Sequence, residues 1–312
     1  MTTSTPLPPP VGDILGRIGG TAMVPLRRIA PAGGARVLLK LESENPTGSM
    51  KDRMALAMVE AAEADGRLAP GAPVVEYTGG STGVSLALVC AVKGHPLHVV
   101  SSDAFAAAKL EHMRVLGARL RIVASDGGRM TGQLTRDMIA LAGEISAALP
   151  GSFWTDQMNN LDQLAAYHRM ADEIRQQTGG RIDALVQSVG TAASIRGLGE
   201  GVRRWAPHAT VVAVEPAESA VLSGGASGAH RIDGIGAGYV VPMWRAELAS
   251  RIERVSTDDA RAMAARLAAE EGLHAGTSTG ANVVAALRVA ADLGPAATVV
   301  TGMCDTGLKY LT

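Results

Sequence analysis

The chain of 312 residues lacks an excess of charge of either sign. Its 29 Lys and Arg residues are balanced by 30 Asp and Glu residues, so it offers no basic surface for nucleic acid and no cationic stripe for a membrane. Aromatic residues make up only 3% of the sequence, which argues against a platform on which single-stranded bases could stack. We therefore expect neither nucleic acid nor a membrane as a partner.

Cysteine and long apolar runs are also scarce. The only two cysteines, Cys90 and Cys304, indicate a reduced intracellular protein without a disulfide framework or a zinc site. The seven histidines show no metal-ligand spacing, so no metal site is expected. The N-terminus lacks the basic start and apolar stretch of a signal peptide, and no run of about 18 uncharged apolar residues predicts a membrane helix. These absences favour the cytoplasm.

What the sequence does have is a regular alternation of strand-like and helix-like segments. Apolar strands are predicted at 35–42, 73–78, 96–102, 118–125, 183–190, 210–216 and 297–302. Helices are predicted at 54–66, 81–94, 104–117, 129–147, 164–179, 257–272 and 281–294. Strands of this apolar kind, alternating with helices, are typical of parallel sheets that helices cover on both faces. The sequence therefore predicts an α/β fold.

The alternation breaks near residues 148–165, which predicts a boundary between two α/β domains. We expect a mobile tail at 1–12, an N-terminal domain at 13–150 and a C-terminal domain at 151–312. The first ~35 residues of the N-terminal domain could pack on the other domain. The mixture of acidic and basic residues at 249–259 is interpreted as solvated surface, and Thr257 as a helix cap.

Four stretches rich in Gly, Ser and Thr open predicted helices. They are NPTGSMKDR at 45–53, EYTGGSTG at 76–83, SVGTAAS at 188–194 and GTSTGAN at 276–282. A loop that opens a helix exposes free backbone N–H groups at the positive end of the helix dipole, which suits phosphate. Three such loops beside a lysine that follows a turn predict a ligand with a phosphate and other polar groups.

Nucleotide binding is the main competing interpretation. The chain has no G-x-x-x-x-G-K-[ST] run, as a P-loop requires. A dinucleotide-binding G-x-G-x-x-G has to follow a strand directly and open a helix. The segment at 197–201 falls within a probable helix and that at 234–238 within an irregular region, so both are weak candidates.

A phosphate site together with an unusual lysine points instead to pyridoxal phosphate, whose aldehyde condenses with a lysine amine. The lysines of the chain are Lys40, Lys51, Lys93, Lys109 and Lys309. Only Lys51 lies at a loop-to-helix junction rich in turn residues. The sequence therefore predicts Lys51 as the covalent anchor of the cofactor.

Eight blocks then occur in an order that resembles a known family. They are KLESENPTGSMKDR, EYTGGSTG, DQMNN, SVGTAAS, VEPAES, GIGAGYVVP, EEGLHAGTSTGA and CDTGLKYL. From about residue 14 to residue 312, the chain resembles the cysteine synthase (O-acetylserine sulfhydrylase) and cystathionine β-synthase group of fold type II pyridoxal phosphate enzymes. The resemblance implies two domains, each with a twisted, mostly parallel sheet flanked by helices, as in the tryptophan synthase β-like fold, and a homodimer.

The resemblance also implies residue roles. Lys51 matches the Schiff-base lysine that also handles the substrate α-proton. The phosphate cup matches Gly190, Thr191, Ala192, Ala193 and Ser194. The loop that grips the substrate α-carboxylate matches Thr78, Gly79, Gly80, Ser81 and Thr82, joined by Gln157, with Gly236 beside the mouth of the site. Ser278 matches a hydroxyl that faces the pyridine nitrogen, which favours β-elimination over transamination because it does not enforce a charged ring.

The chain departs from the family pattern at three places. Ser81 stands where the family has an asparagine that contacts both cofactor and substrate, so that contact is either lost or bridged by water. Ala192 and Ala193 replace glycines, which disfavours a positive φ but leaves the N–H donors. Cys304 precedes Asp305 where the family has Pro or Ser, and we interpret it as an inert buried thiol.

The resemblance implies β-replacement on an activated serine through an aminoacrylate, most simply O-acetylserine and sulfide giving cysteine and acetate. Related enzymes use an amine, cyanide or homocysteine as the nucleophile. A lyase of the serine or threonine dehydratase type is a second alternative. A non-catalytic binding protein of the same fold is a third, and the intact Lys51 argues against it.

Overall fold

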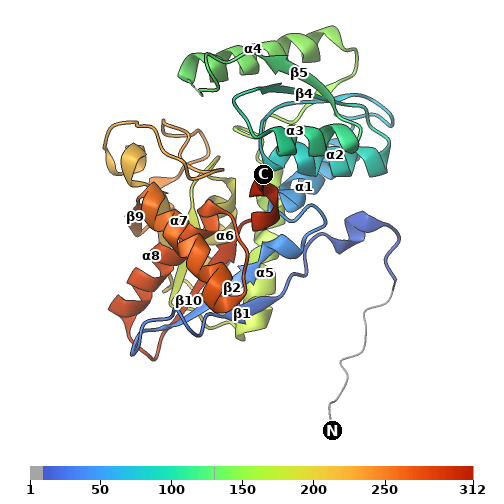
Figure 1. Ribbon diagram of the computed structural model, residues 1–312. Coiled ribbons are helices and arrows are strands. Elements are labelled where there is room, and N and C mark those ends of the chain that lie inside the picture. Colours follow the sequence, from blue (N-terminus) through green and yellow to red (C-terminus); the bar gives the residue numbers. More distant parts are fainter. Residues whose placement is uncertain (1–9, 130, 312) are drawn as a thin grey trace.

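The computed structural model describes residues 10–129 and 131–311 (Figure 1). Most of the predicted tail at 1–12 lies outside the described residues, and residues 10–12 are exposed. The strands are β1 Met23–Pro25, β2 Arg36–Leu41, β3 Val74–Tyr77, β4 Leu97–Ser102, β5 Arg119–Val123, β6 Phe153–Trp154, β7 Ala184–Ser188, β8 Thr210–Pro216, β9 Arg251–Val255 and β10 Thr298–Met303. The α-helices are α1 Lys51–Ala64, α2 Ser81–Lys93, α3 Ala107–Val115, α4 Gly132–Ala148, α5 Gln163–Thr178, α6 Ala193–Arg203, α7 Thr257–Arg266 and α8 Thr277–Leu293.

The strands form two sheets, which we call the large and the small sheet. The large sheet has the order β1-β2-β10-β7-β8-β9, and the small sheet has the order β5-β4-β3-β6. All neighbours are parallel except β1, which runs antiparallel to β2 at one edge. The predicted α/β fold with mostly parallel sheets is confirmed.

The large sheet separates two hydrophobic cores because side chains alternate across a strand. On β7, Leu185 enters one core, whereas Ala184 and Val186 enter the other. Helices α5 and α6 cover the first face, and α8 covers the second. The first core continues through α1 and α2 to Val74 and Val99 of the small sheet, whose other face is covered by α4. The two sheets therefore share one apolar core.

Strands from both sides of the predicted boundary at residue 150 meet in each sheet. Strand β2 pairs with β10 in the large sheet, although it belongs to the first part of the chain. Strand β6 pairs with β3 in the small sheet, although it follows residue 150. Both pairings join segments that are far apart in sequence, so the division of the chain into domains at residue 150 stays a prediction.

The stretch at 249–259, which its charges predicted to be solvated surface, contains a strand. Residues Arg251–Val255 form β9, which pairs with β8. The charges remain compatible with a strand because Arg251 bonds to Asp292 and Arg288 bonds to Glu253. The cap of α7 also differs from the expected one: the Ser256 hydroxyl accepts from the Asp259 N–H, and Thr257 is the first helical residue.

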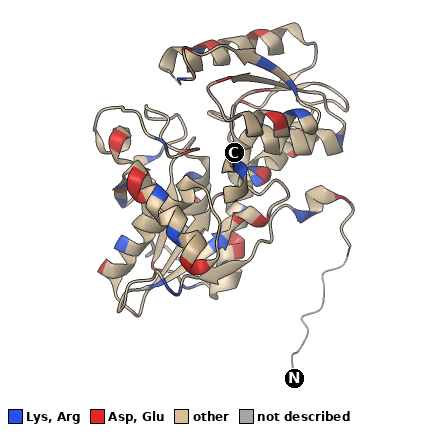
Figure 2. Cartoon of the chain, in the orientation of Figure 1, with Lys and Arg blue, Asp and Glu red and all other residues tan. Residues whose placement is uncertain are grey.

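Charged residues of both signs are interspersed over the helices of both sheets (Figure 2). Within the described residues, no helix combines the length and apolar character that a membrane span needs. One ionic cluster, however, is buried. Arg53 of α1 donates to Glu42 at 2.5 Å and to Glu173 of α5 at 2.7 Å, and Lys40 of β2 lies 2.7 Å from Glu173. The cluster therefore fixes α1, the helix that Lys51 opens, against the large sheet.

Replacing Arg53 with alanine should destabilise the fold strongly. Glu42 is fully buried, and the change would leave its carboxylate without its cationic partner. We expect a loss of about 3–5 kcal/mol in the free energy of unfolding, measured by urea denaturation. The control is Arg114→Ala, which removes an exposed ion pair with Glu111 and should cost less than about 1 kcal/mol. Equal losses in the two variants would contradict the assigned role of Arg53.

Candidate active site

Lys51 is the first residue of α1 and follows a tight turn. Gly48 takes a φ of 72°, and a Cβ there would lie 2.6 Å from Thr306 Cγ2, so only glycine fits. The Lys51 side chain is half-buried. Its backbone N–H donates to Ser49 Oγ at 3.2 Å, but among the described residues its amine makes no hydrogen bond or ion pair. The amine is therefore free for covalent chemistry.

The end of β10 holds this turn in place. The Met50 N–H donates to the Cys304 carbonyl at 2.9 Å, and the Thr306 N–H donates to the Gly48 carbonyl at 2.9 Å. Both contacts lie just beyond the carboxyl end of a central parallel strand, where α/β proteins place their ligand sites. Lys51 is thus fixed to the large sheet at a functional edge.

The predicted phosphate cup lies at the same edge, between β7 and α6. Ala192 takes a φ of 70°, so the expectation that alanine would avoid a positive φ is wrong at this position. The strain is of the order of 1–3 kcal/mol, and the fully packed surroundings of Ala192 enforce it. No acceptor among the described residues bonds to the N–H of Thr191 or of Ala192. These donors at the N-terminus of α6 suit a phosphate group.

Two glycines bring a second loop against the phosphate cup. The Gly236 N–H donates to the Val189 carbonyl at 2.9 Å, and Gly236 has a φ of 67°. A Cβ on Gly190 would lie 2.5 Å from the Gly234 carbonyl oxygen. A small pocket opens here, lined among others by Gly190, Ser219 and Tyr239. Gly236 therefore lies beside the loop predicted to form the phosphate cup.

Ser278 is buried in the first turn of α8. The same turn reaches Cys304, whose N–H donates to Thr279 Oγ1 at 3.0 Å. Asn282, one turn further along α8, accepts from the Ser188 N–H at 2.8 Å. Helix α8 therefore connects the end of β10 with the start of the phosphate cup.

Cys304 is a buried thiol whose pKa is raised. Burial is the main cause and Asp305 adds to it, whereas Lys51, Ser188 and Ser278 act in the opposite direction. A raised pKa keeps the thiol neutral, which agrees with the interpretation of Cys304 as unreactive.

The predicted carboxylate loop joins β3 to α2. Gly79 lies directly under the Phe105 ring, where a Cβ would clash with the ring carbons. The Thr82 hydroxyl donates to Gln157 Oε1 at 2.8 Å, and Gln157 Nε2 donates to the Tyr77 carbonyl at 3.2 Å. The structure therefore brings the loop and Gln157 together.

The buried carboxylate of Glu76 holds the backbone of Gln157 in place. Glu76 accepts from the Thr155 hydroxyl at 2.5 Å and from the Gln157 N–H at 3.1 Å. Burial raises the pKa of Glu76 to about 7, against the effect of these donors. The sequence suggested no role for Glu76, although this residue is the first of the EYTGGSTG block.

The sequence also passed over Lys309, which lies on the short 3₁₀ helix η7 (Gly307–Tyr310) between the two sheets (Figure 1). Its ammonium donates to Ser81 Oγ at 3.3 Å. Its presence in the CDTGLKYL block was the available signal. The predicted site residues thus form two groups, one around the ends of β7 and β10 with the Lys51 turn and one around the loop at 78–82 with Gln157, and Lys309 extends from the chain after β10 to the second group.

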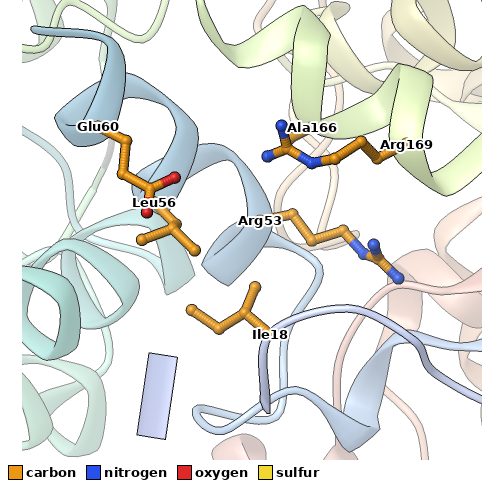
Figure 3. A pocket seen from close by; sticks show the side chains of 6 residues that line it. All are labelled: Ile18, Arg53, Leu56, Glu60, Ala166 and Arg169. Carbon is orange, nitrogen blue, oxygen red and sulfur yellow. The ribbon is translucent and has the colours of Figure 1, made fainter. Parts of the chain in front are cut away.

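A different pocket lies behind α1, with about 450 Å³ of space including the part open to solvent. Figure 3 shows Arg53, Leu56 and Glu60 of α1 directed toward it, together with Ile18 and residues of α5. Positions 53, 56 and 60 share one helix face, whereas position 51 is rotated about 200° away. This pocket is therefore separate from Lys51.

The residues present fit pyridoxal phosphate. Among the described residues, the Lys51 amine and the N–H groups of Thr191 and Ala192 have no partner, and Ser278 offers a buried hydroxyl. When bound, the cofactor supplies an electron sink for the pair left on the substrate Cα after its proton departs.

Comparisons with known proteins agree with this fit. A family model described as "Pyridoxal-phosphate dependent enzyme" matches residues 14–305. A cysteine synthase of Staphylococcus aureus is 37% identical over 304 residues, covering 97% of this chain and 96% of that one.

Two solved structures are similar in fold as well as in sequence. An O-acetyl serine sulfhydrylase, isoform 3, from Entamoeba histolytica has a TM-score of 0.92 at 36% identity, covering 100% of this chain and 93% of that one. An O-ureido-L-serine synthase has a TM-score of 0.88 at 34% identity, covering 97% of this chain and 94% of that one. The predicted resemblance is confirmed, and the chain belongs to the family of pyridoxal-phosphate dependent enzymes.

Proposed function

We propose that this enzyme replaces the Cβ substituent of an activated serine, with O-acetylserine and sulfide giving cysteine and acetate. The observation that carries the proposal is that the Lys51 amine, which has no partner among the described residues, and the buried Ser278 hydroxyl both lie near Cys304, at the sheet edge where Thr191 and Ala192 offer free N–H donors. The names of the relatives support it, since they include cysteine synthase and O-acetyl serine sulfhydrylase.

Each residue set has one task in this proposal. Lys51 would hold the cofactor covalently, the loop at 190–194 would bind its phosphate, and Ser278 would face its ring nitrogen. The loop at 78–82, with Gln157, would bind the substrate α-carboxylate through hydroxyl and N–H donors. Because Ser278 is neutral, the ring nitrogen need not carry a proton, which favours elimination over transamination.

The bonds change in a fixed order. The Lys51 amine takes the proton from Cα, and the Cβ–O bond breaks as acetate leaves with its electron pair. Sulfide then forms the Cβ–S bond, and Lys51 returns a proton to Cα. The loop at 78–82 keeps the substrate carboxylate in place throughout, so that Cα stays within reach of Lys51.

We further propose that the enzyme works as a cytoplasmic homodimer, in line with the family resemblance. Light scattering coupled to size-exclusion chromatography should then give twice the chain mass of 32.0 kDa. The mass of a single chain across the accessible concentration range would contradict the dimer.

Lys51→Ala should abolish the reaction. The variant loses both the covalent anchor and the base for the α-proton, so we expect cysteine formation to fall by about 10³-fold or more. Borohydride reduction followed by mass spectrometry should place the cofactor on Lys51 in the wild type only. The control is Lys93→Ala, since Lys93 forms a peripheral ion pair with Glu63 and should be dispensable. Activity retained in Lys51→Ala would refute the proposed function.

Glu76 should make stability depend on pH. Its pKa is about 7 in the folded chain against an ordinary value of 4.5, so between these pH values the folded state binds a proton that the unfolded state releases. This contribution favours folding below about pH 4.5 and is lost as pH rises through about 7. The free energy of unfolding of the wild type should therefore fall from pH 5 to pH 8 relative to Glu76→Gln, measured by urea denaturation. Parallel profiles for the two proteins would show that Glu76 does not titrate in this range.

A further inference from the structure

Lys309 is half-buried at the edge of the candidate site. Among the described residues it forms no ion pair, and its one hydrogen bond goes to the neutral Ser81 hydroxyl at 3.3 Å. Burial lowers the pKa of Lys309, with Lys109 and Lys51 adding to the effect, whereas Asp305 and Asp52 oppose it. A partly desolvated ammonium of this kind is stabilised by an incoming anion.

The neighbouring charged groups contact residues other than Lys309, although Asp305 Oδ1 has no hydrogen-bond partner among the described residues. Asp52 accepts from Thr47 and Ser85, and Asp305 accepts from the Tyr310 hydroxyl at 2.6 Å. The Lys109 ammonium lies 4.2 Å from the centre of the Tyr310 ring and 4.0 Å from Asp233. Among the described charged residues around Lys309, it is thus the Lys309 ammonium that contacts the carboxylate loop.

The contact with Ser81 places this charge where the substrate is expected. Ser81 is the first residue of α2 and carries only a short hydroxymethyl group. It can offer one O–H donor but no charge, and that hydroxyl already accepts from Lys309. A carboxylate bound at the loop would therefore meet both the Ser81 hydroxyl and the Lys309 ammonium.

We propose that Lys309 binds the α-carboxylate of the amino-acid substrate and makes the enzyme selective for substrates in which this group is free. The inference rests on the proposed function for the location of the substrate. Lys309 follows the large sheet whereas Ser81 opens a helix of the small sheet, so a carboxylate held by both residues also links the two sheets.

The test compares Lys309→Met, which removes the charge at similar length, with Lys309→Arg, which keeps it. Both are prepared with pyridoxal phosphate bound, and cofactor content and urea midpoint are checked first. Binding of O-acetylserine and of its carboxamide is followed by the visible absorbance of the cofactor. Steady-state kinetics give KM and kcat for O-acetylserine and KM for sulfide.

We expect Lys309→Met to weaken binding of O-acetylserine and to raise its KM by roughly 10- to 100-fold, as for the loss of a charge-assisted hydrogen bond. We expect kcat and the KM for sulfide to change by less than about threefold, carboxamide binding to be unaffected, and Lys309→Arg to retain most of the affinity. Lys93→Met, at the far end of α2, is the matched control and should behave like the wild type.

The proposal is overturned if O-acetylserine binds Lys309→Met as it binds the wild type, or if the carboxamide loses as much affinity. It is also overturned if the KM for sulfide changes instead, because Lys309 would then serve the nucleophile. If Lys309→Met does not retain the cofactor, Lys309→Gln is measured in its place against the same criteria. The binding assay needs no turnover, so a wild type that binds O-acetylserine but makes no cysteine would refute the proposed function alone.

Discussion

The candidate site depends on two backbone hydrogen bonds between the turn at 48–50 and the chain at 304–306. They join segments more than 250 residues apart and attach the start of α1 to the end of a central strand. Without them, Lys51 would be an ordinary lysine at a helix start. With them, Lys51 is held at the carboxyl ends of the parallel strands of the large sheet, where the phosphate cup and Ser278 also lie.

The surroundings of Lys51 combine buried charge with neutral donors. Behind α1, the cluster around Arg53 matches cations to carboxylates, which holds the helix rigidly. In front of it, the loops at 78–82 and 190–194 present N–H and hydroxyl groups instead of charged side chains. These loops can bind anionic groups through neutral donors, and Lys309 adds a positive charge to the carboxylate loop.

Much of the fold could be predicted because it follows from local patterns. The apolar run at 35–42 became β2, and the helix predicted at 81–94 became α2, since periodicity and glycine signals act over a few residues. Strands β1, β6 and β9 escaped prediction because their existence depends on pairing with other strands and not on a local pattern. The positive φ of Ala192 escaped for a similar reason: packing around the loop overrides the preference of alanine.

The sequence by itself determined the α/β class, the importance of Lys51 and the Gly-rich loops, and through its ordered blocks the cofactor. These are carried by residue types at short spacing, which need no knowledge of distant contacts. Only the tertiary structure decided that Glu76 supports Gln157 and that Lys309 reaches Ser81, a residue 228 positions away. The first contact depends on the pairing of β6 with β3 and the second on how the two sheets pack, and no local pattern records either.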